Sequence, residues 1–241
     1  MQPDLLDQAA TVVAGCHRTG ARTMVGITGP PGAGKSTLAE ALASRFAAAP
    51  TPAPGQAPGP GPAQAPADPH GAVVVPMDGF HLSNVELTRL GLVDRKGAPE
   101  TFDADGFVHL LSRIRAGRDL VYAPAYSRVL HESIGGAIPV PADAELVLVE
   151  GNYLLLPQPP WVRARPYLDL VLYLDVPAGP RLDGLVRRHM ARGLDRHAAM
   201  DFVTRSDEAN TRLVESTRQY ADVIITRGDE SDAPAPAAGL S

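Results

Sequence analysis

The sequence predicts an α/β fold built on a doubly wound parallel sheet, and three observations support this prediction. Short apolar runs typical of buried strands alternate with segments whose apolar residues recur at helical spacing. A glycine-rich loop joins the first of these strands to a helix. At 241 residues, the chain is long enough for one domain with a sizeable core.

Five runs are predicted to form the sheet, and helical patterns separate them. A first helix is expected over residues 4–20 and further helices over 38–46, 83–90, 103–114 and 181–218, the last with a break near Gly193. The strands are expected at residues 22–28, 72–77, 145–150, 169–175 and 221–225. Residues 120–126 are extended, and Pro124 favours a position at a sheet edge.

We expect a single domain over residues 1–227 followed by a tail, and two segments of the chain are not expected to contribute to the core. Sixteen of the twenty residues at 50–69 are Pro, Ala or Gly, and none is aromatic or a branched aliphatic. Such a segment buries too little apolar area to offset its ordering entropy, so residues 49–71 are interpreted as a mobile insertion. The polar, Pro- and Ala-rich residues 228–241 are interpreted as a disordered tail.

Composition and charge argue against several classes of protein. The formal net charge of −5 disfavours a nucleic-acid partner, because phosphate backbones require clustered positive charge. Cys16 is the only cysteine, so no intrachain disulfide can form. No apolar run approaches membrane-spanning length, and the first residues lack the basic and apolar regions of a secretion signal. We therefore expect a cytoplasmic protein that binds neither nucleic acid nor membrane.

The loop after the first strand fits the pattern G-x-x-x-x-G-K-[ST], and its flanking strand and helix provide the context that this pattern requires. Glycines let the backbone wrap closely around phosphate oxygens, and a helix N-terminus adds a positive dipole. Lys35 would place a charge near the β- and γ-phosphates, and Ser36 would offer a hydroxyl to Mg²⁺. The loop is therefore predicted to bind a nucleotide through Gly29, Gly32, Ala33, Gly34, Lys35, Ser36 and Thr37.

Two acidic residues follow predicted strands and are expected at the same edge of the sheet as this loop. Asp78 follows the second strand, where its carboxylate can accept a proton from an alcohol; the alternative is a turn residue before Gly79. Glu150 ends the third strand, where it can hold Mg²⁺; the alternative is a plain strand-terminal charge.

A basic cluster lies on the helix after the fourth strand and consists of Arg187, Arg188 and Arg192. Residues 180–218 can therefore act as a helical lid that closes over bound phosphates. The alternative is a solvated helix face. The chain has no Asn-Lys-x-Asp motif and no Leu-Ser-Gly-Gly-Gln signature, which argues against a regulatory GTPase and a transporter ATPase.

Four blocks of sequence are similar to one superfamily of kinases, which includes uridine kinase, bacterial pantothenate kinase and phosphoribulokinase. These blocks are residues 76–82, 95–103, 124–128 and 149–153. The resemblance extends over residues 22–228 apart from the Pro-rich insertion, and it is strongest to the nucleoside/nucleotide kinase branch, some members of which are labelled sugar-transport-associated kinases. It implies a P-loop kinase fold and transfer of phosphate from ATP to an alcohol.

The resemblance also implies roles for individual residues. Asp78 would be the general base, while Lys35, Ser36 and Glu150 would lie at the phosphates and the Mg²⁺ ion. Arg187 and Arg192 would be catalytic lid arginines, and Arg188 and Arg227 would contact the nucleotide. The small-molecule acceptor would bind at Asp78, Phe80, His81, Arg95, Lys96, Asp103, Tyr126, Arg128 and His131.

The identity of the acceptor is left open by this resemblance. The first two blocks look closer to pantothenate kinase, but Arg128 replaces a histidine of that family's substrate loop. His131 agrees with uridine kinase, whereas Ser127 replaces an aspartate of that enzyme. We expect a kinase of a nucleoside- or sugar-like alcohol. The alternatives are a pantothenate kinase and a nucleotide-binding regulator without transfer activity, and a homodimer is one option for the assembly.

Replacing residues 50–69 with a short Gly/Ser linker tests the interpretation of this segment as an insertion. We expect the melting temperature and the rate of ATP turnover to stay nearly unchanged, because the segment has no residues that build a core. Thermal unfolding of the shortened and full-length proteins provides the measurement. A drop of several degrees would show that the segment packs against the domain.

Overall fold

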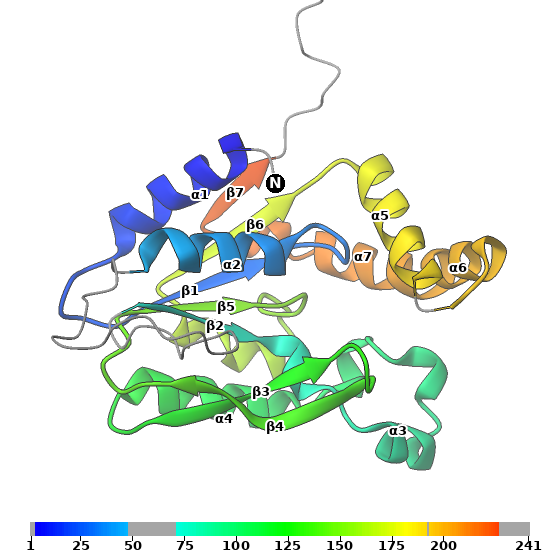
Figure 1. Ribbon diagram of the computed structural model, residues 1–241, viewed down its shortest axis with the longest axis horizontal. Helices are drawn as coiled ribbons and strands as arrows, with labels where there is room; N and C mark the ends of the chain where they lie inside the picture. Colours follow the sequence, from blue (N-terminus) through cyan, green and yellow to red (C-terminus); the bar gives the residue numbers. More distant parts are fainter. Residues whose placement is uncertain (1–2, 48–70, 192, 227–241) are drawn as a thin grey trace, which may run out of the picture.

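The computed structural model describes residues 3–47, 71–191 and 193–226. At its centre is a sheet of five parallel strands, which confirms the doubly wound α/β architecture (Figure 1). In spatial order the strands are β2 (Ala72–Pro76), β5 (Leu146–Glu150), β1 (Thr23–Thr28), β6 (Leu170–Asp175) and β7 (Val223–Thr226). All five correspond to the runs predicted from the sequence, and β1 lies in the middle.

Helices cover both faces of the sheet, as the apolar strands require. One face packs against α1 (Pro3–Cys16) and α2 (Lys35–Phe46), and the other packs against α4 (Ala104–Ala116) (Figure 1). The strands contribute residues to a hydrophobic core on each face of the sheet. Val25 belongs to the core beneath α1 and α2, while Val147 belongs to the core beneath α4. The first helix ends at Cys16, four residues before the predicted end at Gly20.

A second, two-stranded sheet lies beside the main one and was only half predicted. Residues 120–126 were expected at a sheet edge, and β3 (Val121–Ser127) instead forms a separate antiparallel hairpin with β4 (Glu132–Val140). The sequence did not predict β4, because its largely exposed residues include two consecutive glycines and lack apolar alternation. The hairpin packs beside a short 3₁₀ turn, Met77–Phe80, that follows β2.

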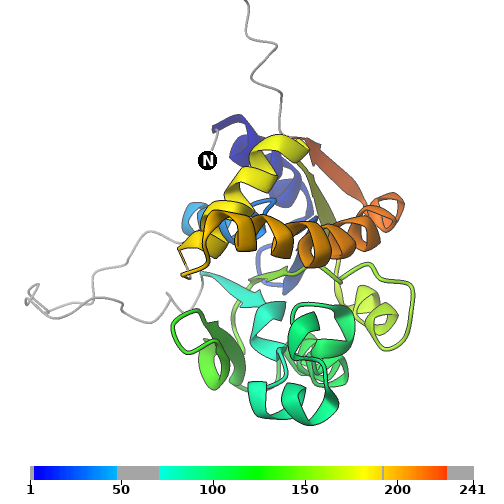
Figure 2. The same ribbon diagram turned by 90° about the vertical axis from the view of Figure 1, so that its right-hand side faces the viewer.

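The remaining helices lie beyond the carboxyl ends of the strands (Figures 1 and 2). The predicted capping box at the start of α3 (Asn84–Leu90) is confirmed, because Ser83 Oγ accepts a hydrogen bond from the backbone N–H of Glu86. The helix expected over 181–218 is divided more finely than predicted. It comprises α5 (Ala178–Met190), α6 (Arg196–Phe202), a π-helical turn (Val203–Asp207) and α7 (Glu208–Glu215).

The predicted break near Gly193 is present, since α5 ends at Met190 and Gly193 has a φ of 96°. Three groups of expectations lie outside the described residues: the insertion apart from residue 71, the tail at 228–241, and the roles of Arg192 and Arg227. A single domain over residues 1–227 stays a prediction.

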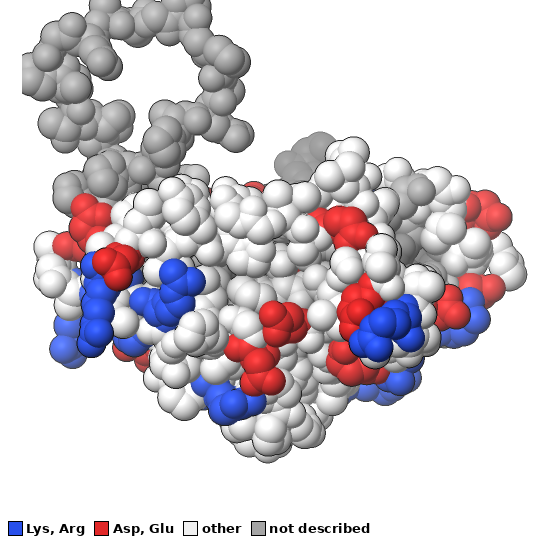
Figure 3. Space-filling model, turned by 90° about the horizontal axis from the view of Figure 1, so that it is seen from below, with Lys and Arg blue, Asp and Glu red and all other residues white. Residues whose placement is uncertain are grey.

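The surface carries charges of both signs. On the face shown in Figure 3, Lys and Arg side chains lie in separate groups with Asp and Glu side chains near them, so this face has no continuous basic surface. Within the described ranges, no helix combines the length and the apolar character needed to cross a bilayer.

Gly79→Ala tests the close approach between the turn that carries Asp78 and the β3–β4 hairpin. A Cβ atom on Gly79 would lie 2.2 Å from the carbonyl oxygen of Pro124, so the two backbones must separate. We expect the melting temperature to fall by roughly 3–10 °C, as for other overpacked sites. The matched control is Gly135→Ala on β4, where an added Cβ meets no atom within 4 Å. Equal melting temperatures for the two variants would contradict the packing described.

Candidate functional site

The loop between β1 and α2 requires glycine at three positions. Gly29, Gly32 and Gly34 have φ values of 146°, 80° and 92°, which side-chain-bearing residues rarely adopt. Gly29 is also sterically restricted, because a Cβ there would lie 2.6 Å from the carbonyl oxygen of Leu174 on β6. This path brings Gly34 to the N-cap of α2 and starts the helix at Lys35, so the unpaired N–H groups of the first turn lie at the loop.

Lys35 is almost fully buried at the start of α2, with 8% of its surface exposed. Its Nζ atom donates to the carbonyl oxygens of Gly29 at 2.9 Å and Pro30 at 3.0 Å. Burial lowers the pKa of Lys35 to about 8, although the nearby carboxylates of Glu150 and Asp78 oppose this shift. A buried ammonium held by neutral carbonyls is well suited to gain an anionic partner.

Glu150 ends β5 directly opposite this loop and is also buried. Ser36 Oγ donates to Glu150 Oε1 at 3.1 Å. Burial, and after it the charge of Asp78, raise the pKa of Glu150 to about 7. Two carboxylates and a hydroxyl therefore share a region of low dielectric in which a cation would relieve their repulsion.

This donor set fits Mg²⁺ better than a metal held by protein ligands alone. Among the described residues, no group of three His, Cys, Asp or Glu side chains could hold a metal ion. Mg²⁺ in proteins commonly takes one or two carboxylates and completes its shell with water and phosphate oxygens. The Ser36–Glu150 pair matches that arrangement.

Asp78 lies on the 3₁₀ turn that follows β2, the neighbour of β5 in the sheet. Its carboxylate is half-buried and close enough to Lys35 and Glu150 to shift the pKa values of both. The turn itself is held in place, because the ring Nδ1 of His81 lies 2.7 Å from the backbone oxygen of Asp78. Asp78, Lys35 and Glu150 thus line one cavity.

A cavity of about 580 Å³ brings most of the predicted site residues together. It extends from the glycine-rich loop to the β3–β4 hairpin, with α5 and the π-helical turn on a further side. The predicted residues that line it are Gly32, Gly34, Lys35, Ser36, Thr37, Asp78, His81, Lys96, Tyr126, Arg128, His131, Glu150 and Arg188.

Other predicted residues lie outside the cavity lining. Phe80 packs edge-on against Phe107 in the core, and Arg95 forms an exposed ion pair with Glu100. Asp103 caps α4 by accepting a hydrogen bond from the N–H of Gly106.

Three further predicted residues, two in the glycine-rich loop and one on α5, also lie outside the cavity lining. Gly29 and Ala33 belong to the glycine-rich loop but do not line the cavity, and Gly29 contributes a carbonyl to Lys35 instead. Arg187 is exposed on α5 and is also absent from the lining, whereas Arg188 is part of it.

A buried arginine that was not predicted from the sequence ties the glycine-rich loop to the helical segment. Arg181 in the first turn of α5 donates to Glu208 Oε1 at 2.7 Å and to Thr211 Oγ1 at 3.0 Å, both on α7. It also lies 3.4 Å from the carbonyl oxygen of Pro31 in the loop. Its partners are 27 to 150 positions away, so no local sequence pattern marks it.

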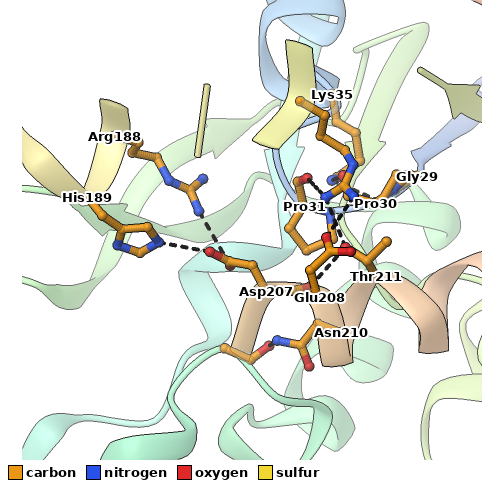
Figure 4. A network of polar contacts seen from close by, with 12 residues as sticks. Gly29, Pro30, Pro31, Lys35, Arg188, His189, Asp207, Glu208, Asn210 and Thr211 are labelled. Atoms are coloured by element: carbon orange, nitrogen blue, oxygen red, sulfur yellow. Dashed lines mark hydrogen bonds and ion pairs between the residues drawn. The ribbon is translucent and has the colours of Figure 1, made fainter. Parts of the chain in front are cut away.

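A second group lies between α5 and the π-helical turn, and of its residues only Arg188 was predicted from the sequence (Figure 4). His189 Nε2 lies 2.8 Å from Asp207 Oδ2, and Arg188 Nη2 lies 3.9 Å from Asp207 Oδ1. The His189 ring also packs against Phe202, with 4.6 Å between the ring centroids and a tilt of 48°. Asp207 thus holds Arg188 and His189 on the cavity wall, and Asn210 lines the same wall.

The glycine-rich loop follows a central strand, contains a buried lysine and faces a cavity that extends well beyond the loop. This combination is typical of the P-loop kinases. The sequence model described as "Phosphoribulokinase / Uridine kinase family" matches residues 24–234. The chain belongs to this family, whose members are ATP-binding kinases.

The proteins that are similar to this chain have varied names. A protein of Escherichia coli (strain K12) named "Uncharacterized protein YggC" is 33% identical, over 87% of this chain and 79% of its own length. A protein of Schizosaccharomyces pombe named "Putative uridine kinase C227.14" is 30% identical, over 85% and 83%. A "Pantothenate kinase" of Bacillus velezensis is 30% identical, over 63% of this chain but only 44% of the enzyme.

A similar solved structure comes from Silicibacter sp. TM1040 and is described as a "putative fructose transport system kinase". It is 34% identical to this chain and has a TM-score of 0.74. The similarity covers 91% of this chain and 98% of that one.

Glu150→Gln tests the cost of burying a carboxylate at the end of β5. The pKa of Glu150 rises from 4.5 to about 7 on folding, so between these pH values the folded state keeps a proton that the unfolded state has released. The contribution of Glu150 to stability is therefore present at low pH and is lost as the pH rises through about 7.

Thermal or denaturant unfolding from pH 5 to pH 8 provides the measurement. We expect wild-type stability to fall relative to Glu150→Gln across this range, by roughly 2–3 kcal/mol. A stability difference that does not change with pH would show that Glu150 is ionised at all these values.

Proposed function

We propose that this protein is a cytoplasmic, ATP-dependent kinase that transfers the γ-phosphoryl group of MgATP to a hydroxyl of a nucleoside- or sugar-like metabolite. One observation carries the proposal: Asp78 lies in the same cavity as the Lys35 phosphate loop and the polar residues of the β3–β4 hairpin. The name of the Schizosaccharomyces pombe relative supports a nucleoside as acceptor, and the name of the Silicibacter protein supports a sugar.

The phosphate loop would bind and orient the triphosphate. Lys35 would exchange its carbonyl partners for oxygens of the β- and γ-phosphates, and the glycines would let the backbone approach them closely. Ser36 and Glu150 would hold Mg²⁺, which neutralises charge on the phosphate oxygens when it is bound. These residues position the γ-phosphoryl group towards the cavity.

Asp78 would act as the general base on the acceptor. Its carboxylate would accept the proton of the attacking hydroxyl as the new O–P bond forms and the bond to the β-phosphate oxygen breaks. The products would be ADP, the phosphate ester and a protonated Asp78. The short contact between His81 and the backbone of Asp78 would keep this turn in place.

The helical segment would supply positive charge to the transferring group. Arg188 faces the cavity and Asp207 orients it, so we propose that Arg188 takes the role expected of Arg187. Arg192 and Arg227 keep their proposed roles as lid and nucleotide contacts. Closure of α5–α7 would exclude water from the reaction.

A pantothenate kinase is the second candidate. The Bacillus velezensis relative favours it, and so do the blocks at residues 76–82 and 95–103. Arg128, which replaces that family's histidine, lines the cavity and speaks against an unchanged substrate site. A regulator without transfer activity would have no use for an acid beside the phosphate site, so we place it third.

Asp78→Asn tests the proposed base. The amide keeps the shape and hydrogen-bonding reach of the carboxylate but has no basic form, so we expect kcat to fall roughly 10²–10⁴-fold. MgATP affinity should change little, because the phosphate loop and Glu150 remain. Steady-state kinetics and calorimetric titration with MgATP provide the two measurements.

The matched control is Asp103→Asn, because Asp103 caps α4 outside the cavity and asparagine caps helices about as well as aspartate. Its kcat should stay near the wild-type value. Normal turnover by Asp78→Asn would place the base elsewhere, and loss of ATP binding would make Asp78 a metal ligand.

Arg188→Ala and Arg187→Ala test which arginine serves the phosphates. They are neighbours on α5, but only Arg188 lines the cavity. We expect Arg188→Ala to lower kcat about 10²-fold or more and to affect the KM for ATP less, since it would stabilise charge that develops during transfer. Arg187→Ala should change kcat only a few-fold. A larger loss for Arg187 would show that the helix rotates when the lid closes.

A further inference from the structure

The first turn of α7 is linked to two sides of the cavity. One side is the phosphate loop, and the other is the loop at residues 95–101, which we call the acceptor loop because it carries Lys96. Two side chains of this turn hold Arg181, which reaches the phosphate loop. Asn210 from the same turn points away from the phosphate loop and donates to Gly97 in the acceptor loop (Figure 4).

The link to the phosphate loop consists of a buried guanidinium and a close packing contact. Arg181 is only 4% exposed, and its Nη1 atom lies 3.4 Å from the carbonyl oxygen of Pro31, which is long for a hydrogen bond. One turn further along α5, Leu185 packs against the same loop, because a Cβ on Gly32 would lie 2.8 Å from Leu185 Cγ. A movement of the phosphate loop therefore reaches α5, and through Arg181 it reaches α7.

The link to the acceptor loop is the carbonyl oxygen of Gly97. Asn210 Nδ2 donates to this oxygen at 3.3 Å, and Tyr153 Oη donates to it from the buried segment that follows β5. Gly97 has a φ of 103°, which side-chain-bearing residues rarely adopt, so a glycine is needed to present the oxygen to both donors. The acceptor loop is thus held between the core of the domain and α7.

The acceptor loop has little regular structure of its own. The backbone N–H groups of Gly97, Ala98 and Thr101 all donate to oxygens within the loop. Single turns of this kind open readily unless contacts from outside hold them. The hydrogen exchange of these three amides therefore reports how firmly Asn210 and Tyr153 hold the acceptor loop.

We infer that Arg181 and Asn210 are positioning residues that couple the nucleotide to the acceptor loop. The inference rests on the proposed function, in which Lys96 of this loop serves the acceptor. A triphosphate that fills the phosphate loop fixes its backbone against α5, and this restricts α7 through Arg181. Asn210 then holds the acceptor loop more firmly. Nucleotide binding thus prepares the acceptor side of the cavity, and by reciprocity an acceptor strengthens nucleotide binding.

Hydrogen exchange read by mass spectrometry, with and without Mg²⁺ and the non-hydrolysable analogue AMPPNP, tests this coupling without knowledge of the acceptor. In the wild type we expect AMPPNP to slow exchange in the phosphate loop, in α7 and in the acceptor loop, by about 5-fold or more in the last. Asn210→Ala removes the far link, so only the slowing in the acceptor loop should be lost. Arg181→Met removes the near link, so the slowing in α7 should be lost as well.

Arg212→Ala is the matched control, because Arg212 is exposed on the same helix. It should show the wild-type response in all three segments. The decisive quantity is the change that AMPPNP causes. A purely structural role for Asn210 would speed the exchange of the acceptor loop with and without AMPPNP and would leave that change intact.

Three results would overturn the inference. The first is an acceptor loop that AMPPNP slows equally in Asn210→Ala and the wild type, as direct contact with the nucleotide would produce. The second is a wild-type acceptor loop that does not respond although the phosphate loop does, and the third is an unchanged response of α7 in Arg181→Met. If Arg181→Met does not fold, Asn210→Ala decides. A phosphate loop that itself shows no response would instead reject the proposed kinase function.

Discussion

The burial of Lys35 is the constraint on which the rest of the site depends. An ammonium inside a protein is costly unless it has hydrogen-bond partners and opposite charges nearby. Two loop carbonyls supply the hydrogen bonds, and Glu150 and Asp78 supply the charges. The arrangement leaves Lys35 with a lowered pKa and Glu150 with a raised one, and a nucleotide with its cation would satisfy both.

The parallel sheet explains how these residues come together. Strands β2, β5 and β1 are neighbours, and the carboxyl ends of parallel strands meet at one edge. Glu150 is the last residue of β5, and Asp78 and the glycine-rich loop follow β2 and β1, so the strand order alone places these three features side by side. Arg181 then links the same loop to α7, which couples the helical segment to the phosphate site.

The distinction between local and long-range contacts explains which features of the fold and the site could be predicted from the sequence. The shared location of the loop, Asp78 and Glu150 could be predicted because the motif and the strand ends are local features of the sequence. The same holds for the Ser83 cap of α3. Arg181 and the His189–Asp207 pair were missed because their partners are distant in sequence. Arg188 could not be separated from Arg187, since adjacent residues on a helix differ by about 100° in direction and the orientation of α5 depends on tertiary packing.

The central claim is that one cavity binds ATP and an alcohol and transfers phosphate between them. Following ATP by ³¹P NMR in the presence of a panel of nucleosides, sugars, sugar phosphates and pantothenate tests it most directly. We predict that, with the right acceptor, a new phosphate monoester signal grows at the same rate as ADP. ATP that binds but yields only inorganic phosphate, or no product at all, with every acceptor would contradict it.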